Sequence, residues 1–118
     1  MIRLHVAEMM IAFVFIAGGM STLRNPQARV DEIARVRFPL PELAVRINAS
    51  LMIVAGIALA LNIQAALASL VLAMLLVPTT VFGHAFWTEQ GQRRQLQMAN
   101  FFKNLAILGG LLLVTLVR

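Results

Sequence analysis

Three polar residues interrupt the last apolar run of the chain. Asn100, Lys103 and Asn104 lie within Gln97–Val117, and their spacing of three and four residues places them on one face of a helix. An ammonium group flanked by two amides can bind an anionic or carbonyl oxygen of a polar head group. A charge within hydrocarbon is costly and indicates a functional partner. The alternative is structural: Lys103 snorkels to the membrane surface and the amides hydrogen-bond neighbouring helices.

Other apolar runs also carry isolated polar side chains. Asn48 lies near the start of one run, and His84 and Trp87 lie near the end of the next. An imidazole can donate or shuttle a proton, whereas an indole ring is typical of the membrane interface. Near the N-terminus, His5 and Glu8 are three residues apart on one helix face. We expect these two to form an outer-side polar pair that hydrogen-bonds internally or to water, and the alternative is an outward-facing proton site.

The composition predicts that these residues are carried by membrane-spanning helices. Of 118 residues, 60% are hydrophobic and 13% are charged, and the mean hydropathy is +0.84. A soluble domain is about 25% charged, and a small one buries only ~60–70% of its unfolded surface. The net charge of +5 comes mostly from arginines that flank apolar runs. This pattern indicates contact with lipid head groups rather than with nucleic acid, and we expect one membrane domain over residues 1–118.

Four runs reach the ~20 apolar residues that a spanning helix needs. The predicted spans are 4–23, 43–61, 65–84 and 97–117. A tight turn at 62–64 must separate the middle two, because a single helix through 47–87 would be about twice the ~30 Å hydrocarbon thickness. The predicted fold is an all-α membrane protein, an antiparallel four-transmembrane-helix bundle.

The segment between the first two spans predicts a short amphipathic helix. Asn25 can cap this helix with Pro26 at its first position, and Val30 and Ile33 recur at helical spacing. The two prolines in RFPLP, residues 37–41, end it. We expect it to lie along the membrane surface, and the alternative is a docking surface for a soluble partner.

The distribution of arginines predicts the orientation. Five arginines lie between the first two spans and two between the last two, whereas Arg3 and Arg118 lie on the opposite side. By the positive-inside rule, both larger loops face the cytoplasm and both termini face outward. In this arrangement Asn48, His84 and Lys103 reach a similar depth in the inner half of the membrane.

The polar residues favour an amphiphile over a haem or a metal. The chain has no cysteine, which excludes disulfides and thiolate metal sites. His5 starts the first span and His84 ends the third, and these helices run in the same direction. Their imidazoles therefore lie ~30 Å apart across the hydrocarbon and cannot ligate one haem within a single chain. No His/Glu spacing indicates a metal site. The functional interpretation of the polar cluster is a cavity that holds the polar head of a lipid, a quinone or another amphiphile.

Several motifs resemble those of the DoxX family of small bacterial membrane proteins. The motifs are FVFIAGGMSTLRNP at 13–26, INASLMIVAGIALALN at 47–62, GHAFW at 83–87 and FFKNLAILGGLLL at 101–113. The resemblance runs nearly end to end, with the fourth span as its most specific part. It implies a four-helix bundle in the bacterial cytoplasmic (inner) membrane, and it points to His84, Phe86, Trp87, Phe101, Lys103, Asn104, Gly109 and Gly110. Family members often carry a glutamate at or near the position of Asn48.

The family resemblance also suggests a function. The family is named for a subunit of an archaeal thiosulfate:quinone oxidoreductase, and the resemblance implies association with soluble redox or oxidative-stress enzymes. The leading hypothesis is a non-catalytic membrane subunit or scaffold that binds a quinone- or lipid-like amphiphile near the cytoplasmic side. Its predicted ligand residues are Asn48, His84, Trp87, Asn100, Lys103 and Asn104. There are two alternatives. One is a transporter, which would act as a homo-oligomer because four short helices leave little room for alternating access. The other is a purely structural membrane protein.

Overall fold

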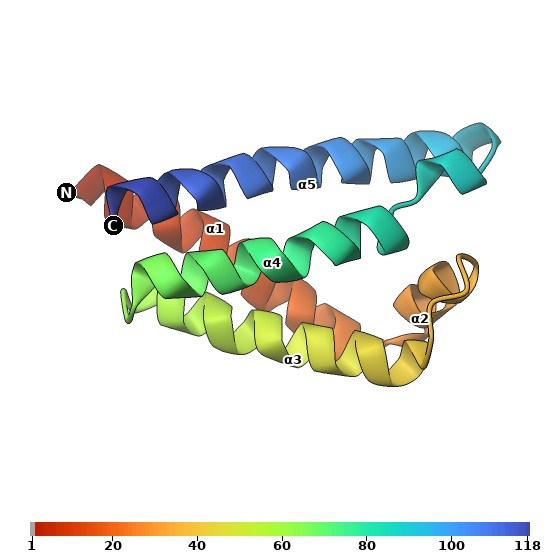
Figure 1. The fold of residues 1–118 in the computed structure, drawn as a ribbon, viewed down its shortest axis with the longest axis horizontal. Coiled ribbons are helices and arrows are strands. Elements are labelled where there is room, and N and C mark those ends of the chain that lie inside the picture. The colour runs from red at the N-terminus through yellow and green to blue at the C-terminus, as the bar shows by residue number, and fades with distance from the viewer. Residues whose placement is uncertain (1) are drawn as a thin grey trace.

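Four long helices make up most of the chain. In the computed structural model, which describes residues 2–118, the long helices are α1 (Ile2–Arg24), α3 (Pro41–Ala60), α4 (Ala65–Gly83) and α5 (Gly91–Val117) (Figure 1). A short helix, α2 (Gln27–Ala34), joins α1 to α3, and a 3₁₀ turn, η1 (Phe86–Thr88), joins α4 to α5. Each long helix is long and apolar enough to cross a membrane. The predicted all-α fold with four spans and a short loop helix is confirmed.

Most helix ends lie within two residues of the sequence-based prediction, but the start of α5 and the cap of α2 differ from it. α5 begins at Gly91, six residues before the predicted start of the fourth span. The extra turns contain Gln and Arg, which form helix readily outside the membrane but lower the hydropathy that defines a span. At α2 the expected cap is wrong, because Pro26 occupies the N-cap position and no side chain caps the helix. The backbone N–H of Asn25 instead continues the hydrogen bonding of α1, to Ser21 O at 3.2 Å.

The tight turn between α3 and α4 lies where the sequence predicts it. Asn62 has a positive φ of 56°, its N–H bonds Leu59 O at 3.0 Å, and the N–H of Ile63 bonds Ala58 O at 2.8 Å. This pair of bonds is the Schellman arrangement, which satisfies the last carbonyls of a helix and favours Gly or Asn at its left-handed residue. A polar residue that tolerates this conformation therefore reverses the chain at the end of α3.

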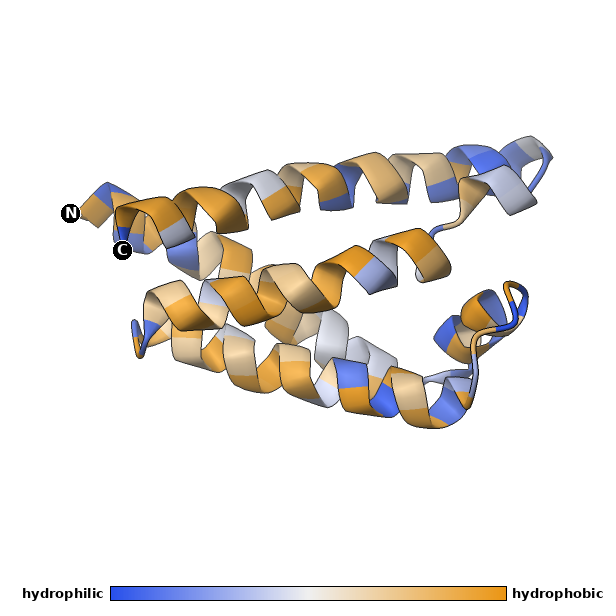
Figure 2. Ribbon diagram, in the orientation of Figure 1, coloured by the Kyte–Doolittle hydropathy of each residue, from blue (hydrophilic) through white to orange (hydrophobic). Residues whose placement is uncertain are grey.

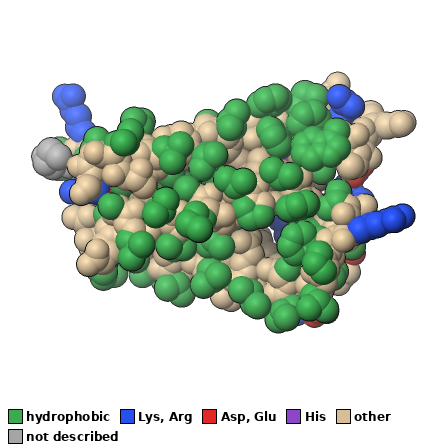
Figure 3. Space-filling view, in the orientation of Figure 1, with side chains coloured by type: hydrophobic (Ala, Val, Ile, Leu, Met, Phe, Trp, Pro, Cys, Tyr) green, Lys and Arg blue, Asp and Glu red, His purple; other side chains and the backbone are tan. Residues whose placement is uncertain are grey.

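The helices run antiparallel, so the bundle has two distinct ends. The start of α1, the end of α5 and the α3–α4 turn lie together at what we call the terminal end, and α2 and η1 lie at the opposite, loop end (Figure 1). Hydrophobic residues cover the middle of the helices, and hydrophilic residues gather toward the loop end (Figure 2). In the space-filling view, apolar side chains cover the side of the bundle and Lys and Arg project from its ends (Figure 3). Such an apolar side is the surface that lipid contacts.

Glycines bring α1 and α3 into close contact. A Cβ built on Gly19 would lie 2.9 Å from the backbone oxygen of Ala49 and 2.6 Å from Ile53, and a Cβ on Gly56 would lie 3.0 Å from Ile16. Close approach of backbones is how helices gain packing energy in lipid, where hydrophobicity supplies little drive to associate. In the terminal half, Leu59, Leu72 and Leu111 are fully buried and fill the core.

We expect Gly19→Ala to weaken the contact between α1 and α3. The added methyl group would overlap a backbone oxygen that cannot move independently of α3, at a cost of about 1–3 kcal/mol. Thermal unfolding of the purified protein in a mild detergent measures the change. Gly109→Ala is the matched control, because a Cβ there meets no atom within 4 Å. Equal unfolding temperatures for the two variants would contradict this account of the packing.

Candidate functional site

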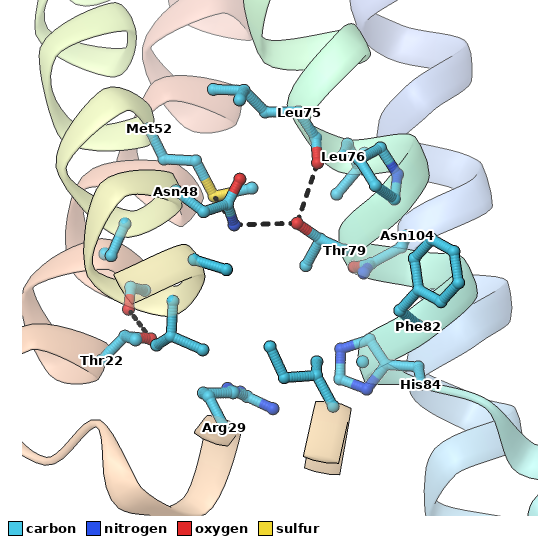
Figure 4. Close-up of a pocket in the computed structure, with 18 of the residues that line it drawn as sticks. Thr22, Arg29, Asn48, Met52, Leu75, Leu76, Thr79, Phe82, His84 and Asn104 are labelled. Carbon is cyan, nitrogen blue, oxygen red and sulfur yellow. Dashed lines mark hydrogen bonds between the residues drawn. The ribbon is translucent and has the colours of Figure 1, made fainter. Parts of the chain in front are cut away.

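A cavity of about 380 Å³ lies in the loop half of the bundle. Its lining comes from all five helices: residues 14–22 of α1, 29–33 of α2, 44–52 of α3, 75–84 at the end of α4, and 103–104 of α5. Figure 4 shows side chains from these helices surrounding the space. The volume is within the ~300–1,000 Å³ of small-molecule sites, which are mostly apolar with a few placed polar groups.

The structure brings four of the six predicted ligand residues to this cavity. Asn48, His84, Lys103 and Asn104 line it, although they come from three different helices. Their common depth follows from the antiparallel order, which places the start of α3, the end of α4 and the first half of α5 at one level. Trp87 and Asn100 are not among the lining residues.

Trp87 belongs to an aromatic cluster outside the cavity. Its ring packs edge-on against Phe86 at 5.3 Å and Phe101 at 5.9 Å between centroids, and the side chain is 51% exposed. The guanidinium of Arg94 lies 5.6 Å from the centre of the Phe86 ring. Aromatic rings beside a basic residue at the end of a span are typical of the membrane interface. This placement agrees with the expectation that Trp87 anchors the helix end.

Asn48 is bonded to a residue that the sequence analysis did not identify. Its Nδ2 donates to Thr79 Oγ1 at 2.9 Å, and the Thr79 hydroxyl donates to Leu75 O at 2.8 Å (Figure 4). Thr79 directly follows Pro78, which lies inside α4 and has no N–H to give to the carbonyl of Met74. A hydroxyl next to a helix-interior proline was a signal for this position, since Ser and Thr side chains in membrane helices often hydrogen-bond a carbonyl of the preceding turn or a neighbouring helix.

His84 is held by a second residue outside the predicted set. Its Nδ1 lies 2.8 Å from Gln97 Oε1, and Gln97 Nε2 donates to Gly83 O at 3.3 Å. Because the amide nitrogen is committed to Gly83, the amide oxygen must accept, so neutral His84 carries its proton on Nδ1. Nε2 is then a hydrogen-bond acceptor, and the ring faces the cavity in Figure 4.

Asn104 and Lys103 are neighbours on α5, but only Asn104 is buried and bonded to another helix. Asn104 is buried, and its Nδ2 donates to Thr80 Oγ1 on α4 at 3.1 Å. Lys103 is exposed, also lines the cavity, and has no carboxylate within 4 Å among residues 2–118. Gln97 and Asn104 are seven residues apart and so share one helix face, which was an available signal that both meet α4.

The loop-end edge of the cavity is formed by charged residues of α2. Arg29 and Glu32 line it and pair with each other at 3.0 Å. Just beyond them, Glu89 accepts from Arg35 at 3.0 Å and from Arg93 at 3.1 Å, which joins the two loops of this end. Partial burial tends to raise the pKa of Glu89, but the hydrogen bonds from Arg93 and Arg35 hold this pKa below its ordinary value of 4.5.

At the terminal end, the structure gives Glu8 a different partner from the expected one. Glu8 is fully buried, and its two carboxylate oxygens accept from Arg118 Nε at 2.8 Å and Nη2 at 2.5 Å. His5 makes no hydrogen bond to Glu8 in the described part of the chain. The expectation of an internal His5–Glu8 bond or a solvated pair is therefore corrected. α5 runs back beside α1, and it brings a guanidinium that can bond both oxygens at once.

Comparisons with known proteins identify the family. The family model for DoxX matches residues 4–85, which is more than half of the chain. The chain belongs to the DoxX family. The match contains the first three spans and His84, but it ends before FFKNLAILGGLLL, so the expectation that the fourth span is the most specific part of the resemblance is not supported.

One relative is similar over nearly the whole DoxX chain. The inner membrane protein YphA of Escherichia coli (strain K12) is 26% identical over 115 residues, covering 98% of this chain and 82% of that protein. No solved structure matches the chain significantly. Among residues 2–118, no three His, Cys, Asp or Glu side chains come together as metal ligands.

The Glu8–Arg118 pair predicts a measurable coupling between α1 and α5. We expect Glu8→Gln and Arg118→Gln each to lower the unfolding temperature in detergent by several degrees, because each leaves a buried or half-buried partner unsatisfied. The double variant should lose less than the sum of the two single changes. Arg3→Gln at the same end is the control. Additive losses would show that the two residues do not interact.

Glu89 predicts an acid-sensitive link between the loops. Since its pKa is lower in the folded protein, the stabilisation is fully present above the ordinary value of 4.5 and is lost as the pH falls through the lowered value. The unfolding temperature of Glu89→Gln should therefore lie below that of the wild type at neutral pH and approach it in acid. Glu42→Gln, which breaks an exposed pair within α3, is the control. A constant difference between pH 7 and pH 3 would contradict the expected role.

Proposed function

We propose that this DoxX-family chain is a non-catalytic membrane subunit that binds one amphiphile in the loop-end cavity. The observation that carries the proposal is that the cavity lining has a polar part and a larger apolar part. Asn48, His84, Lys103 and Asn104 gather on it from three helices, while apolar side chains such as Phe15, Leu51 and Leu76 cover the rest. A head group with hydrogen-bonding atoms and an attached apolar tail matches both parts.

The membrane and its orientation are part of the proposal. The relative YphA is an inner membrane protein by name, which supports the inner membrane for this chain. Seven arginines lie in or next to the loop-end segments, whereas Arg3 and Arg118 lie at the terminal end. By the positive-inside rule the loop end faces the cytoplasm and the termini face outward. The amphiphile then binds in the inner half of the bilayer, within reach of a soluble partner.

A redox role rests on the family resemblance. The linked loops, in which Arg35, Glu89 and Arg93 bond across α2 and α5, would present a rigid basic surface to a cytoplasmic redox enzyme. A quinone and a lipid are both amphiphiles of the proposed kind, and a quinone would give such an enzyme an electron acceptor. The chain contributes binding and docking in this proposal, and the partner contributes the chemistry.

Transport by a single chain is not favoured by the cavity. Its lining is confined to the loop half, and the terminal half is filled by Leu59, Leu72 and Leu111, which are fully buried. A path for a solute would have to run between copies of the chain. If the role were purely structural, a larger side chain in the cavity would change the stability of the bundle and would leave ligand binding unchanged.

Filling the cavity tests whether it holds an amphiphile. Gly18 lines the cavity and a Cβ built on it meets no atom within 4 Å, so Gly18→Leu adds bulk to open space. We expect solvent extracts of the wild-type protein, purified in a mild detergent, to contain one amphiphile in a defined ratio. Gly18→Leu should reduce this ratio by about tenfold or more, because its side chain occupies the space of the ligand.

A matched variant separates occupancy from folding. Gly109 is also surrounded by open space but does not line the cavity, so Gly109→Leu should keep the bound amphiphile. The unfolding temperatures of both variants show whether they fold equally well. An extract with no enriched amphiphile, or equal retention by the two variants, would contradict the binding function.

A further inference from the structure

We propose that the bound amphiphile has a head with one negative charge and a neighbouring hydroxyl, as in a phosphoglycerol lipid, and that Lys103 is its counter-ion. This inference rests on the binding function proposed above and adds the chemical class of the ligand. It follows from the charge balance of the cavity and from the hydrogen-bonding state of its polar atoms.

Among residues 2–118, no carboxylate lies within 4 Å of Lys103 to act as its counter-ion. The titratable groups in the lining are Arg29, Glu32, His84 and Lys103, and the first two neutralise each other at 3.0 Å. The chain has five carboxylate side chains, and each of them has a polar partner other than Lys103. The partners are Arg118 for Glu8, Gln27 for Asp31, Arg29 for Glu32, Arg46 for Glu42, and Arg35 with Arg93 for Glu89. One positive charge is therefore left over beside the cavity.

An ammonium group at the edge of a largely apolar cavity favours an anion at contact distance. Lys103 is exposed, but a head group seated in the cavity would displace water from one side of its ammonium, so an opposite charge within ~4 Å gains more than it would in bulk water. One uncompensated cation matches one negative charge, because a second would remain unpaired in the same surroundings. A monoanionic head satisfies this balance, whereas a zwitterionic head would add its own cation beside Lys103.

Two acceptor atoms of the cavity have no hydrogen-bond donor from the protein. His84 uses Nδ1–H for Gln97 and leaves Nε2 as an acceptor, and Asn48 gives its two N–H groups to Thr79 and, at 3.9 Å, to Met52 Sδ, which leaves its oxygen. Asn104 gives one N–H to Thr80 and keeps the other. A ligand that fits these atoms must donate hydrogen bonds near its negative charge. A glycerol phosphodiester does so through its hydroxyls.

The size of the cavity limits how much of the ligand lies inside. A volume of about 380 Å³ takes a head group and the beginning of its chains, and the side chains of Val14, Met52 and Leu75 provide an apolar lining for them. The rest of an acyl chain lies in the surrounding bilayer. An anion without a tail would satisfy Lys103 but would leave this apolar part in contact with water, so the tail adds affinity.

Native mass spectrometry of the full chain tests the ligand class. The protein in a non-ionic detergent is titrated with phosphatidylglycerol, phosphatidylcholine, and phosphatidylmethanol, which has the charge but no hydroxyl. We expect the first bound copy of phosphatidylglycerol to be retained about tenfold more tightly than phosphatidylcholine, with phosphatidylmethanol in between. Glycerol phosphate and inorganic phosphate serve as tailless competitors and should displace it only at far higher concentration.

Variants assign the preference to named atoms. Lys103→Met should remove the preference for the anionic lipid while the chain still binds lipid, and Lys103→Arg should keep it. His84→Phe should reduce the difference between phosphatidylglycerol and phosphatidylmethanol. Arg94→Gln is the control, because Arg94 lies at the same end but does not line the cavity. The unfolding temperature of each variant confirms that it is folded.

The outcomes separate this inference from the proposed function. Equal retention of the charged and zwitterionic lipids, with loss of both in Gly18→Leu, would overturn the anionic head and leave amphiphile binding intact. If Lys103→Met kept the preference for the anionic lipid, Lys103 would be shown to snorkel to the surface. That result would also overturn the assignment of an anionic head group. Displacement by free phosphate at low concentration would assign the site to a soluble anion instead of a lipid. If Gly18→Leu changed the binding of none of these lipids, the proposed amphiphile-binding function itself would be contradicted.

Discussion

Hydrogen bonds between helices organise the loop half of this protein. A polar side chain in hydrocarbon is costly unless another group of the protein bonds it, and the polar residues at the end of α4 find those partners on both sides. Thr79 bonds α3 through Asn48, and Thr80 and His84 bond α5 through Asn104 and Gln97. α4 is thereby fixed between its neighbours at the level where Pro78 interrupts its backbone bonding. These links set the positions of Asn48, His84 and Asn104 in the cavity lining.

The cavity forms because α1 contacts α5 only near the terminal end and packs against α3 elsewhere. Gly19 and Gly56 keep α1 close to α3, and α1 meets α5 near the terminal end through Glu8 with Arg118 and through Ile11 beside Gly110. Figure 1 shows α1 leaving α5 and crossing toward α3 as it approaches the loop end. The space between them is bordered by α2 at the loop end. Polar groups at its edge and apolar side chains within it then follow from the hydropathy gradient along the helices (Figure 2).

Much of this arrangement could be predicted from the sequence, because lipid imposes simple rules. The apolar runs had to be helices, the run from Ile47 to Trp87 had to reverse, and Asn62 lies at that reversal. The common depth of Asn48, His84, Lys103 and Asn104 followed from antiparallel order. Hydropathy did not show that α5 continues six residues beyond its apolar part, since polar residues outside the membrane form helix equally well. The orientation in the membrane stays a prediction.

The sequence by itself determined how many spanning helices there are, where the chain reverses and at what level along the bundle each polar residue lies, because those properties depend on residue order and on a rise of ~1.5 Å per residue. The tertiary structure alone decided which polar groups meet. Rotation about each helix axis and the distances between helices come from packing, and they turn His84 toward Gln97 and Glu8 toward Arg118 rather than His5. They also leave Lys103 without a carboxylate partner among residues 2–118. A pairing between residues 110 positions apart depends on contacts across the whole bundle, and no local pattern encodes it.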